Sequence, residues 1–215
     1  MLKVQNNEKV DFSPTESSSG SVAKEDRSSQ DFSNRYLEST QETLVGLYAQ
    51  RDSGDGQPVE DINGIIHRVA TSVAIAELKY KLSPEEIVKL SMKEALRHED
   101  VTRWRQVFAD HIGNQKFWAN TPANINADPE VSLNVLKYWA HGNLAGLKED
   151  QIWLRSEHLR KAVQVKETKG LNEHEIEMGR LAGQLRGKGC LAACGVTYVE
   201  DSLEGIQEAA RIEAL

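Results

Sequence analysis

Cys194 is the residue of this sequence whose type and position best suit chemistry. It lies just before the β-branched run Val196-Thr-Tyr-Val199, a composition typical of a short strand. A thiol at the end of a strand can act in redox or acid–base chemistry. The alternative is a buried cysteine that only packs as a small hydrophobic residue.

A helix start follows this strand directly. Asp201, with Glu204 three residues later, has the pattern of a capped helix, and Leu203 and Ile206 begin an apolar face. The free N–H groups of a helix start attract phosphate. Asp201, Ser202 and Leu203 are therefore either part of an anion site or simply a cap, and the negative charge of the aspartate favours the cap.

A metal site is not predicted. Cys190 and Cys194 have no second Cys or His pair at ligand spacing, whereas zinc usually takes four ligands. In an extended chain their Cα atoms would lie about 13 Å apart, too far for a disulfide. A helical turn would bring them closer.

Composition limits the function further. The 215 residues carry a formal net charge of −7 and are 39% hydrophobic and 27% charged. An acidic chain argues against direct DNA binding, which needs a surplus of Lys and Arg. No apolar run approaches the roughly 18 residues that cross a bilayer, and the N-terminus lacks the apolar core of a secretory signal. We therefore expect a cytoplasmic protein without a membrane span.

The elements that must position Cys194 are mainly helical. Residues 1–34 are polar and serine-rich, and we expect a disordered tail. Residues 35–115 show helical spacing, including a run with Ile62, Ile66 and Val69, and Ser83 begins a capped helix. Gly113 is expected to end a helix in a left-handed cap. Further helices are expected over 129–141, 149–163 and 172–187.

Two stretches break the helical pattern, and both resemble one family. Phe117-Trp-Ala-Asn-Thr-Pro-Ala-Asn-Ile-Asn-Ala127 is expected to be irregular, because of its proline and asparagines. It is similar to the Asn-Ser-Pro-Thr-Leu-Met-Asn-Ala-Gly segment of ribonucleotide reductase catalytic chains. The segment Gly189-Cys-Leu-Ala-Ala-Cys-Gly-Val-Thr-Tyr-Val-Glu-Asp-Ser-Leu-Glu-Gly-Ile206 resembles their Gly-Gln-Leu-Ser-Ala-Cys-Phe-Val-Leu-Pro-Val-Glu-Asp-Ser-Leu-Glu-Gly-Ile segment.

Three upstream segments look like the helical region that precedes the catalytic barrel of this family. They are Tyr48-Ala-Gln-Arg-Asp52, Pro58-Val-Glu-Asp and Arg68-Val-Ala-Thr-Ser-Val-Ala74. The residue patterns of these segments are closest to those of the adenosylcobalamin-dependent class II enzymes. The resemblance covers roughly residues 35–215.

The resemblance implies a mainly α chain that leads into the first strand and helix of an incomplete α/β barrel. The helical N-terminal region would span residues 35–115. The start of the barrel domain would span 116–215, with inserted helices at about 128–187. The family replaces the ribose 2′-hydroxyl of a ribonucleotide with hydrogen, by chemistry that begins at a thiyl radical.

The resemblance also implies residue roles. Cys194 matches one of the two cysteines that end as a disulfide. Thr121, Ala193 and Cys194 match substrate-contacting positions. The deoxynucleotide effector would bind at a set of three successive residues near the dimer interface: Asp201, Ser202 and Leu203. Two positions depart from the family, since Ala123 replaces a threonine and Asp128 replaces a glycine.

Two functions follow as hypotheses. In the first, the chain is the N-terminal part of a split or truncated reductase that docks with a complementary C-terminal barrel fragment, works as a dimer, and uses adenosylcobalamin and a thioredoxin-like reductant. The motivation is that the sequence stops at Leu215, where the family continues into a glycine-rich turn. In the second, the chain is a helical interaction or regulatory protein that has lost the chemistry.

Overall fold

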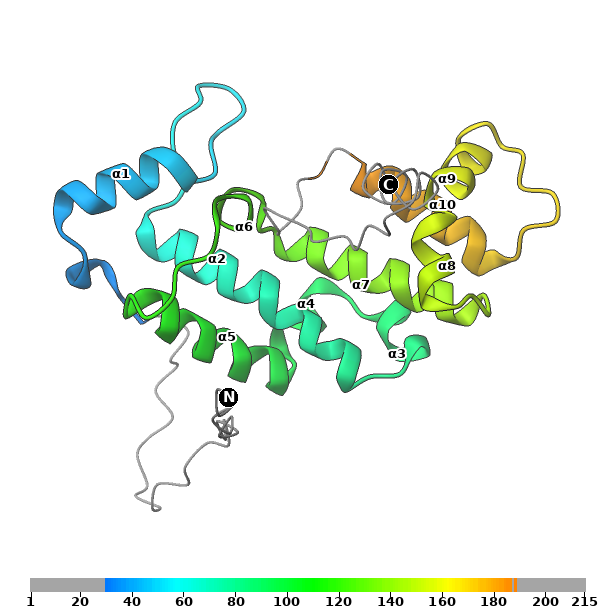
Figure 1. Ribbon diagram of the computed structural model, residues 1–215, viewed down its shortest axis with the longest axis horizontal. Coiled ribbons are helices and arrows are strands. Elements are labelled where there is room, and N and C mark those ends of the chain that lie inside the picture. Colours follow the sequence, from blue (N-terminus) through cyan, green and yellow to red (C-terminus); the bar gives the residue numbers. More distant parts are fainter. Residues whose placement is uncertain (1–29, 187, 189–215) are drawn as a thin grey trace, which may run out of the picture.

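The structure, a computed structural model, describes residues 30–186 and 188. The regular elements of this part are helical (Figure 1), so the prediction of a mainly α chain is confirmed for it. Several predictions lie outside it: most of the tail, the strand at 196–199 and the helix that begins at Asp201. The helices are η2 Ser33–Arg35, α1 Glu38–Tyr48, α2 Ile62–Ala74, η3 Ile75–Tyr80, α3 Pro84–Lys89, α4 Met92–Arg97, α5 Glu99–Gly113, α6 Thr121–Asn126, α7 Pro129–Leu144, α8 Glu149–Leu154, α9 Ser156–Gln164 and α10 Glu173–Leu185.

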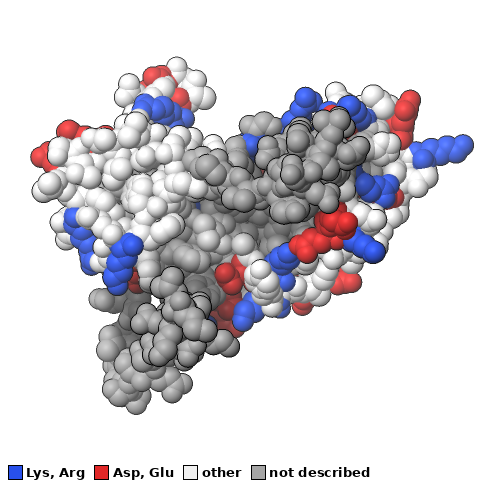
Figure 2. Space-filling view, viewed as in Figure 1, with Lys and Arg blue, Asp and Glu red and all other residues white. Residues whose placement is uncertain are grey.

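The described part is elongated, with α1 at one end and α8–α10 at the other (Figure 1). The long helices α2, α5 and α7 form the middle. Acidic and basic side chains intermingle over the α8–α10 end (Figure 2), in keeping with the ion pairs Arg160–Glu157 and Arg155–Glu175. No helix of the described residues is both long and apolar enough to cross a membrane.

The first of three hydrophobic clusters joins α2, α5 and α6 to the segment before α1. Phe32 is fully buried in it, and its backbone N–H donates to Asn63 Oδ1 at 2.7 Å. A Cβ on Gly113 would lie 2.3 Å from the Phe32 ring. The last residues of the predicted tail, 30–34, therefore belong to the folded part.

The other two clusters share α7. One packs η3, α3 and α5 against Leu133, Leu136 and Ala140. The other packs Tyr138 against α8, α9 and α10, with the Tyr138 hydroxyl donating to the Ile152 carbonyl at 2.7 Å. Helix α7 packs one face into the second cluster and another face into the third. It therefore connects the middle of the molecule to the α8–α10 end.

Helix boundaries largely follow the predicted signals. Ser83 forms a complete capping box with Glu86, as predicted, and Ser91 forms a second one with Glu94. The helix predicted over 149–163 is interrupted at Arg155, which separates α8 from α9. The predicted left-handed cap at Gly113 is wrong: Gly113 is the last helical residue, and Gln115 takes the left-handed conformation with a φ of 58°.

Candidate functional site

The segment that carries Thr121 is built as a short helix, α6. The prediction of an irregular stretch is therefore wrong for residues 121–126. The Asn120 side chain accepts a hydrogen bond from the Ala123 backbone N–H at 3.1 Å and caps the helix. A proline in the first turn gives up no helical hydrogen bond, because N–H groups there have no intrahelical acceptor. Thr121, the first residue of α6, is exposed.

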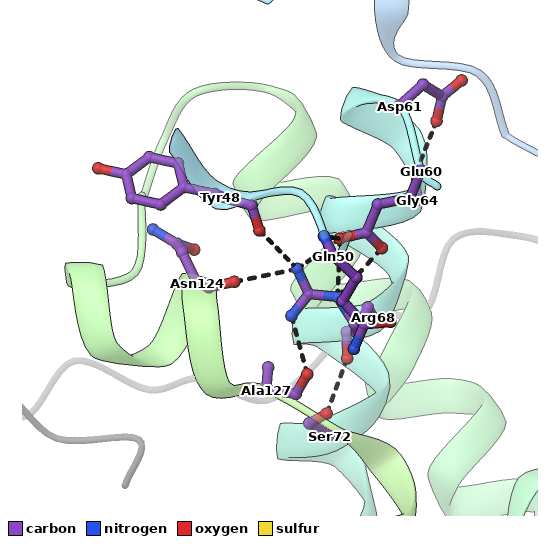
Figure 3. Close-up of polar contacts among 9 residues, drawn as sticks. All are labelled: Tyr48, Gln50, Glu60, Asp61, Gly64, Arg68, Ser72, Asn124 and Ala127. Atoms are coloured by element: carbon purple, nitrogen blue, oxygen red, sulfur yellow. Dashed lines mark hydrogen bonds and ion pairs between the residues drawn. The ribbon is translucent and has the colours of Figure 1, made fainter. Parts of the chain in front are cut away.

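Arg68 anchors this segment to α2 (Figure 3). Its side chain is only 7% exposed and forms an ion pair with Glu60, with Nη2 2.6 Å from Oε1. Its Nε donates to both Glu60 carboxylate oxygens at 3.0 Å. Nη1 donates to the Ala127 carbonyl at 2.8 Å, and Nη2 donates to the Asn124 carbonyl at 3.0 Å.

The same guanidinium also reaches the end of α1, where Nη2 donates to the Tyr48 carbonyl at 3.0 Å. The Arg68 cluster, which we define as Tyr48, Glu60, Arg68, Asn124 and Ala127, thus draws one residue or more from each of four sequence segments. These are the three upstream segments and the 117–127 segment that resemble the reductase family. A guanidinium suits this task because it has five N–H donors in a rigid planar fork, whereas a lysine ammonium has three.

Aromatic side chains flank the Arg68 cluster. The Trp118 ring lies 6.3 Å from the Tyr36 ring and 6.2 Å from the Tyr48 ring, measured between centroids. The Tyr36 hydroxyl donates to the Ile112 carbonyl at 2.8 Å, and burial raises the pKa of Tyr36. These contacts hold the loop before α6 against α1 and α5.

Two buried polar atoms in α6 and its preceding loop have no hydrogen-bond partner among the described residues: Trp118 Nε1 and Asn124 Oδ1. The Asn124 amide does use its other end, since Nδ2 donates to the Ala119 carbonyl at 2.7 Å. Buried polar groups are normally paired. The unpaired donor and acceptor are therefore exceptions in a segment whose other polar contacts are made.

Of the predicted site residues, the structure describes only Thr121. Ala193, Cys194, Asp201, Ser202 and Leu203 lie outside the described residues, so their assembly into one site stays a prediction. Sequence reasoning missed the pairing of Arg68 with Glu60. Both residues lie in the quoted segments, but a spacing of eight residues from a loop into a helix follows no recognised pattern.

A hollow of about 510 Å³ lies between α2 and α7, on the side of α6 that leads into α7. Its walls are mostly apolar and include Val73, Val135 and Trp153, and Asp128 lies at its α6 end. Within the described ranges, no group of three or more His, Cys, Asp or Glu side chains could hold a metal ion.

Comparison with known families addresses the origin of the Arg68 cluster. Residues 33–130 match the family model of the ribonucleotide reductase, all-alpha domain. The matched segment is less than half of the chain, yet it contains the whole Arg68 cluster and Thr121. The match supports an origin in the N-terminal portion of a ribonucleotide reductase and does not distinguish between classes of the enzyme. No curated protein and no solved structure matches the chain.

Proposed function

We propose that this chain is the N-terminal portion of an adenosylcobalamin-dependent ribonucleotide reductase. Together with a complementary barrel portion, it would reduce ribonucleotides to the deoxyribonucleotides used in DNA synthesis. The observation that carries the reductase origin is the all-alpha domain match over residues 33–130. Its support in the structure is the Arg68 cluster, which ties the segment bearing Thr121 to α2. The assignment to the adenosylcobalamin-dependent class rests on the sequence resemblance alone.

In this proposal Cys194 is one of two thiols that supply the reducing electrons. The two thiols lose two protons and two electrons and become a disulfide. The substrate loses its 2′-hydroxyl as water and gains hydrogen at that carbon. A thioredoxin-like dithiol then returns the disulfide to two thiols. Thr121 and Ala193 contact the substrate beside Cys194.

The cofactor is assigned to the barrel portion. We place no contact to adenosylcobalamin on the described residues. When bound, the cofactor supplies the radical that starts the reaction. The task of this chain is to hold α6 and its loop in place for the substrate.

Regulation is assigned to the helix start after the strand. Asp201, Ser202 and Leu203 bind a deoxynucleotide effector near a dimer interface. The anion would be received by the free N–H groups of the helix start, with the Ser202 hydroxyl as an additional donor.

The decisive assay mixes this chain with the barrel portion, adenosylcobalamin and a dithiol, and measures deoxyribonucleotide formation against a working full-length reductase. We expect reduction by the mixture and none by either part alone. Cys194→Ser should abolish turnover while binding between the two parts persists. Cys190→Ser is the matched control and should retain turnover.

No reduction by the wild-type mixture, beside an active full-length control, would overturn the proposal. If Cys194→Ser leaves the chain's binding to an intact reductase and its effect on that enzyme unchanged, the chain is a non-catalytic regulator.

A further inference from the structure

Two histidines face each other between α7 and α10, in a part of the chain that the proposed function leaves unused. Nδ1 of His141, on α7, lies 3.1 Å from Nδ1 of His174, the second residue of α10. The centroids of the two rings are 5.3 Å apart. Both residues lie outside 33–130, the segment matched to the reductase family, so the reductase match does not account for the pair.

The distance between the two nitrogens suits a shared metal ion as well as a hydrogen bond. Two imidazole nitrogens that bind one zinc ion at about 2.0–2.1 Å in a tetrahedral arrangement lie about 3.3 Å apart. A square-planar arrangement at a similar bond length brings them to about 2.9 Å. The observed 3.1 Å falls between these values, so a small rotation of the rings lets both imidazoles bind one ion.

Buried neighbours on both helices hold the two imidazoles in place. Tyr138, one turn before His141, is 1% exposed, and Met178, one turn after His174, is 0% exposed. Both pack in the cluster that joins α7 to α8, α9 and α10. Ligands carried by packed helices are positioned more precisely than ligands carried by loops.

The pair is accessible to a hydrated ion. Both histidines are partly exposed. Oε1 of Glu173 lies 3.8 Å from Nε2 of His174, the ring nitrogen that faces away from the pair. A carboxylate near the far nitrogen of a histidine is the usual outer-shell partner of a metal ligand, because it orients the ring and makes the ligand more basic.

The described residues supply no third protein ligand at this place. Glu177 acts electrostatically on His141, but both of its carboxylate oxygens accept hydrogen bonds from Arg180 Nε. Water must therefore complete the coordination of an ion held by the pair. Structural zinc sites have four protein ligands, so we expect an exchangeable ion here.

We propose that His141 and His174 together bind one divalent transition-metal ion of the zinc, nickel and copper group through their Nδ1 atoms, with water as the remaining ligands. Imidazole suits these ions, whereas Mg²⁺ prefers oxygen ligands. The bound ion links α7 to α10. It stabilises the α8–α10 end, because it binds the folded arrangement better than the unfolded chain.

Isothermal titration calorimetry of the full chain with ZnCl₂ at pH 7.5 tests the proposal. Loss of an outer-shell partner alone costs roughly 10–100-fold in metal affinity. His141→Gln and His174→Gln, which each remove a ligand, should therefore weaken zinc binding by at least about tenfold. His158→Gln, at an exposed position of α9, is the matched control and should bind zinc like the wild type.

A second measurement on the wild-type chain does not depend on the folding of any variant. In nuclear magnetic resonance spectra of the imidazole groups, zinc should shift the ring signals of His141 and His174 and leave those of the other four histidines in place. MgCl₂ should shift neither set. Ring signals of the pair that stay unchanged on zinc addition would overturn the proposal.

The two cysteines are the other zinc ligands that the test must separate from the pair. The double variant Cys190→Ser with Cys194→Ser should keep the histidine-dependent binding. Zinc binding that this variant loses and both histidine variants keep would contradict the proposal. The measurements need no nucleotide, cobalamin or barrel portion, so their outcome is independent of the nucleotide reduction assay.

Discussion

At the scale of single residues, Arg68 has the most demanding role in the described structure. Replacing it with methionine leaves the largely buried Glu60 carboxylate without its cation and three carbonyls without their donor. Removing one partner of a buried ion pair costs about 3–5 kcal/mol. We expect Arg68→Met to lower the free energy of unfolding by about that amount in urea denaturation.

The double variant Arg68→Met with Glu60→Leu serves as the control. It should be less destabilised than the sum of the single variants, because the second change removes the unpaired charge. A loss below about 1 kcal/mol for Arg68→Met, less than a typical buried pair would give, would contradict the anchoring role.

The candidate site could be predicted only in part. The sequence segments around Thr121 and Arg68 were recognisable by resemblance, and the family match over 33–130 supports the same origin. That Arg68 joins them was not predictable, because its carbonyl partners at Tyr48, Asn124 and Ala127 are backbone atoms. Any residue type presents such a carbonyl, so the side-chain pattern gives no signal of the contact.

At the scale of elements, the close approach of α9 and α10 depends on Gly179. A Cβ there would lie 2.5 Å from the Leu159 carbonyl oxygen, a backbone atom that cannot move aside alone. We expect Gly179→Ala to lower the free energy of unfolding by about 1–3 kcal/mol, the usual cost of overpacking.

Gly46→Ala is the matched control, because nothing lies within 4 Å of a Cβ at that position in α1. It should stabilise the protein by about 0.5–1 kcal/mol through helix propensity. Thermal denaturation followed by circular dichroism compares the two variants, and equal melting temperatures would refute the packing argument.

Helix starts were more predictable than helix contacts. The capping box of Ser83 and Glu86 can be recognised from the sequence alone, because both side chains bind backbone groups of their own helix start. The sequence around Gly179 does not reveal that a side chain is excluded there. The atom that excludes it is the Leu159 backbone carbonyl oxygen, twenty residues earlier in the chain. For the same reason Gly113 was misread as a cap, although it makes room for Phe32.

The contact between α7 and α10 should depend on pH through His141. Its Nδ1 lies 3.1 Å from Nδ1 of His174, and burial lowers the pKa of His141 below its ordinary value of 6.5. The Glu177 carboxylate opposes this shift, whereas the charges of His174, Lys137 and Arg180 add to it. A lowered pKa means that the folded state binds fewer protons than the unfolded state. The stabilisation is therefore complete above pH 6.5 and is lost as the pH falls below it.

Urea denaturation at pH 7.5, 6.5 and 5.5 measures this effect. His141→Gln should flatten the fall in stability between pH 6.5 and 5.5, whereas His158→Gln, at an exposed position of α9, should behave like the wild type. A fall as steep in His141→Gln as in the wild type would place the pH dependence elsewhere.

At the scale of the whole molecule, the three hydrophobic clusters form a chain of units rather than one core. Met178 lies at 0% exposure in the cluster of α8, α9 and α10, away from α2 and α5. Met178→Ala should cost about 2–5 kcal/mol and accelerate hydrogen exchange in α8–α10. Protection of α2 and α5 that falls equally would show that the clusters unfold as a single unit.

The burial of Phe32 determines where this protein can be shortened. The family match begins at residue 33, so trimming the gene to the matched domain would delete the ring that fills the space above Gly113. Gln30 would go as well, and its side chain accepts a hydrogen bond from Gln106 at 2.9 Å. We expect a product beginning at residue 33 to lose about 3–5 kcal/mol relative to one beginning at residue 30, a difference that soluble yield and calorimetry would reveal. Expression of the helical region should therefore start at Gln30 or earlier.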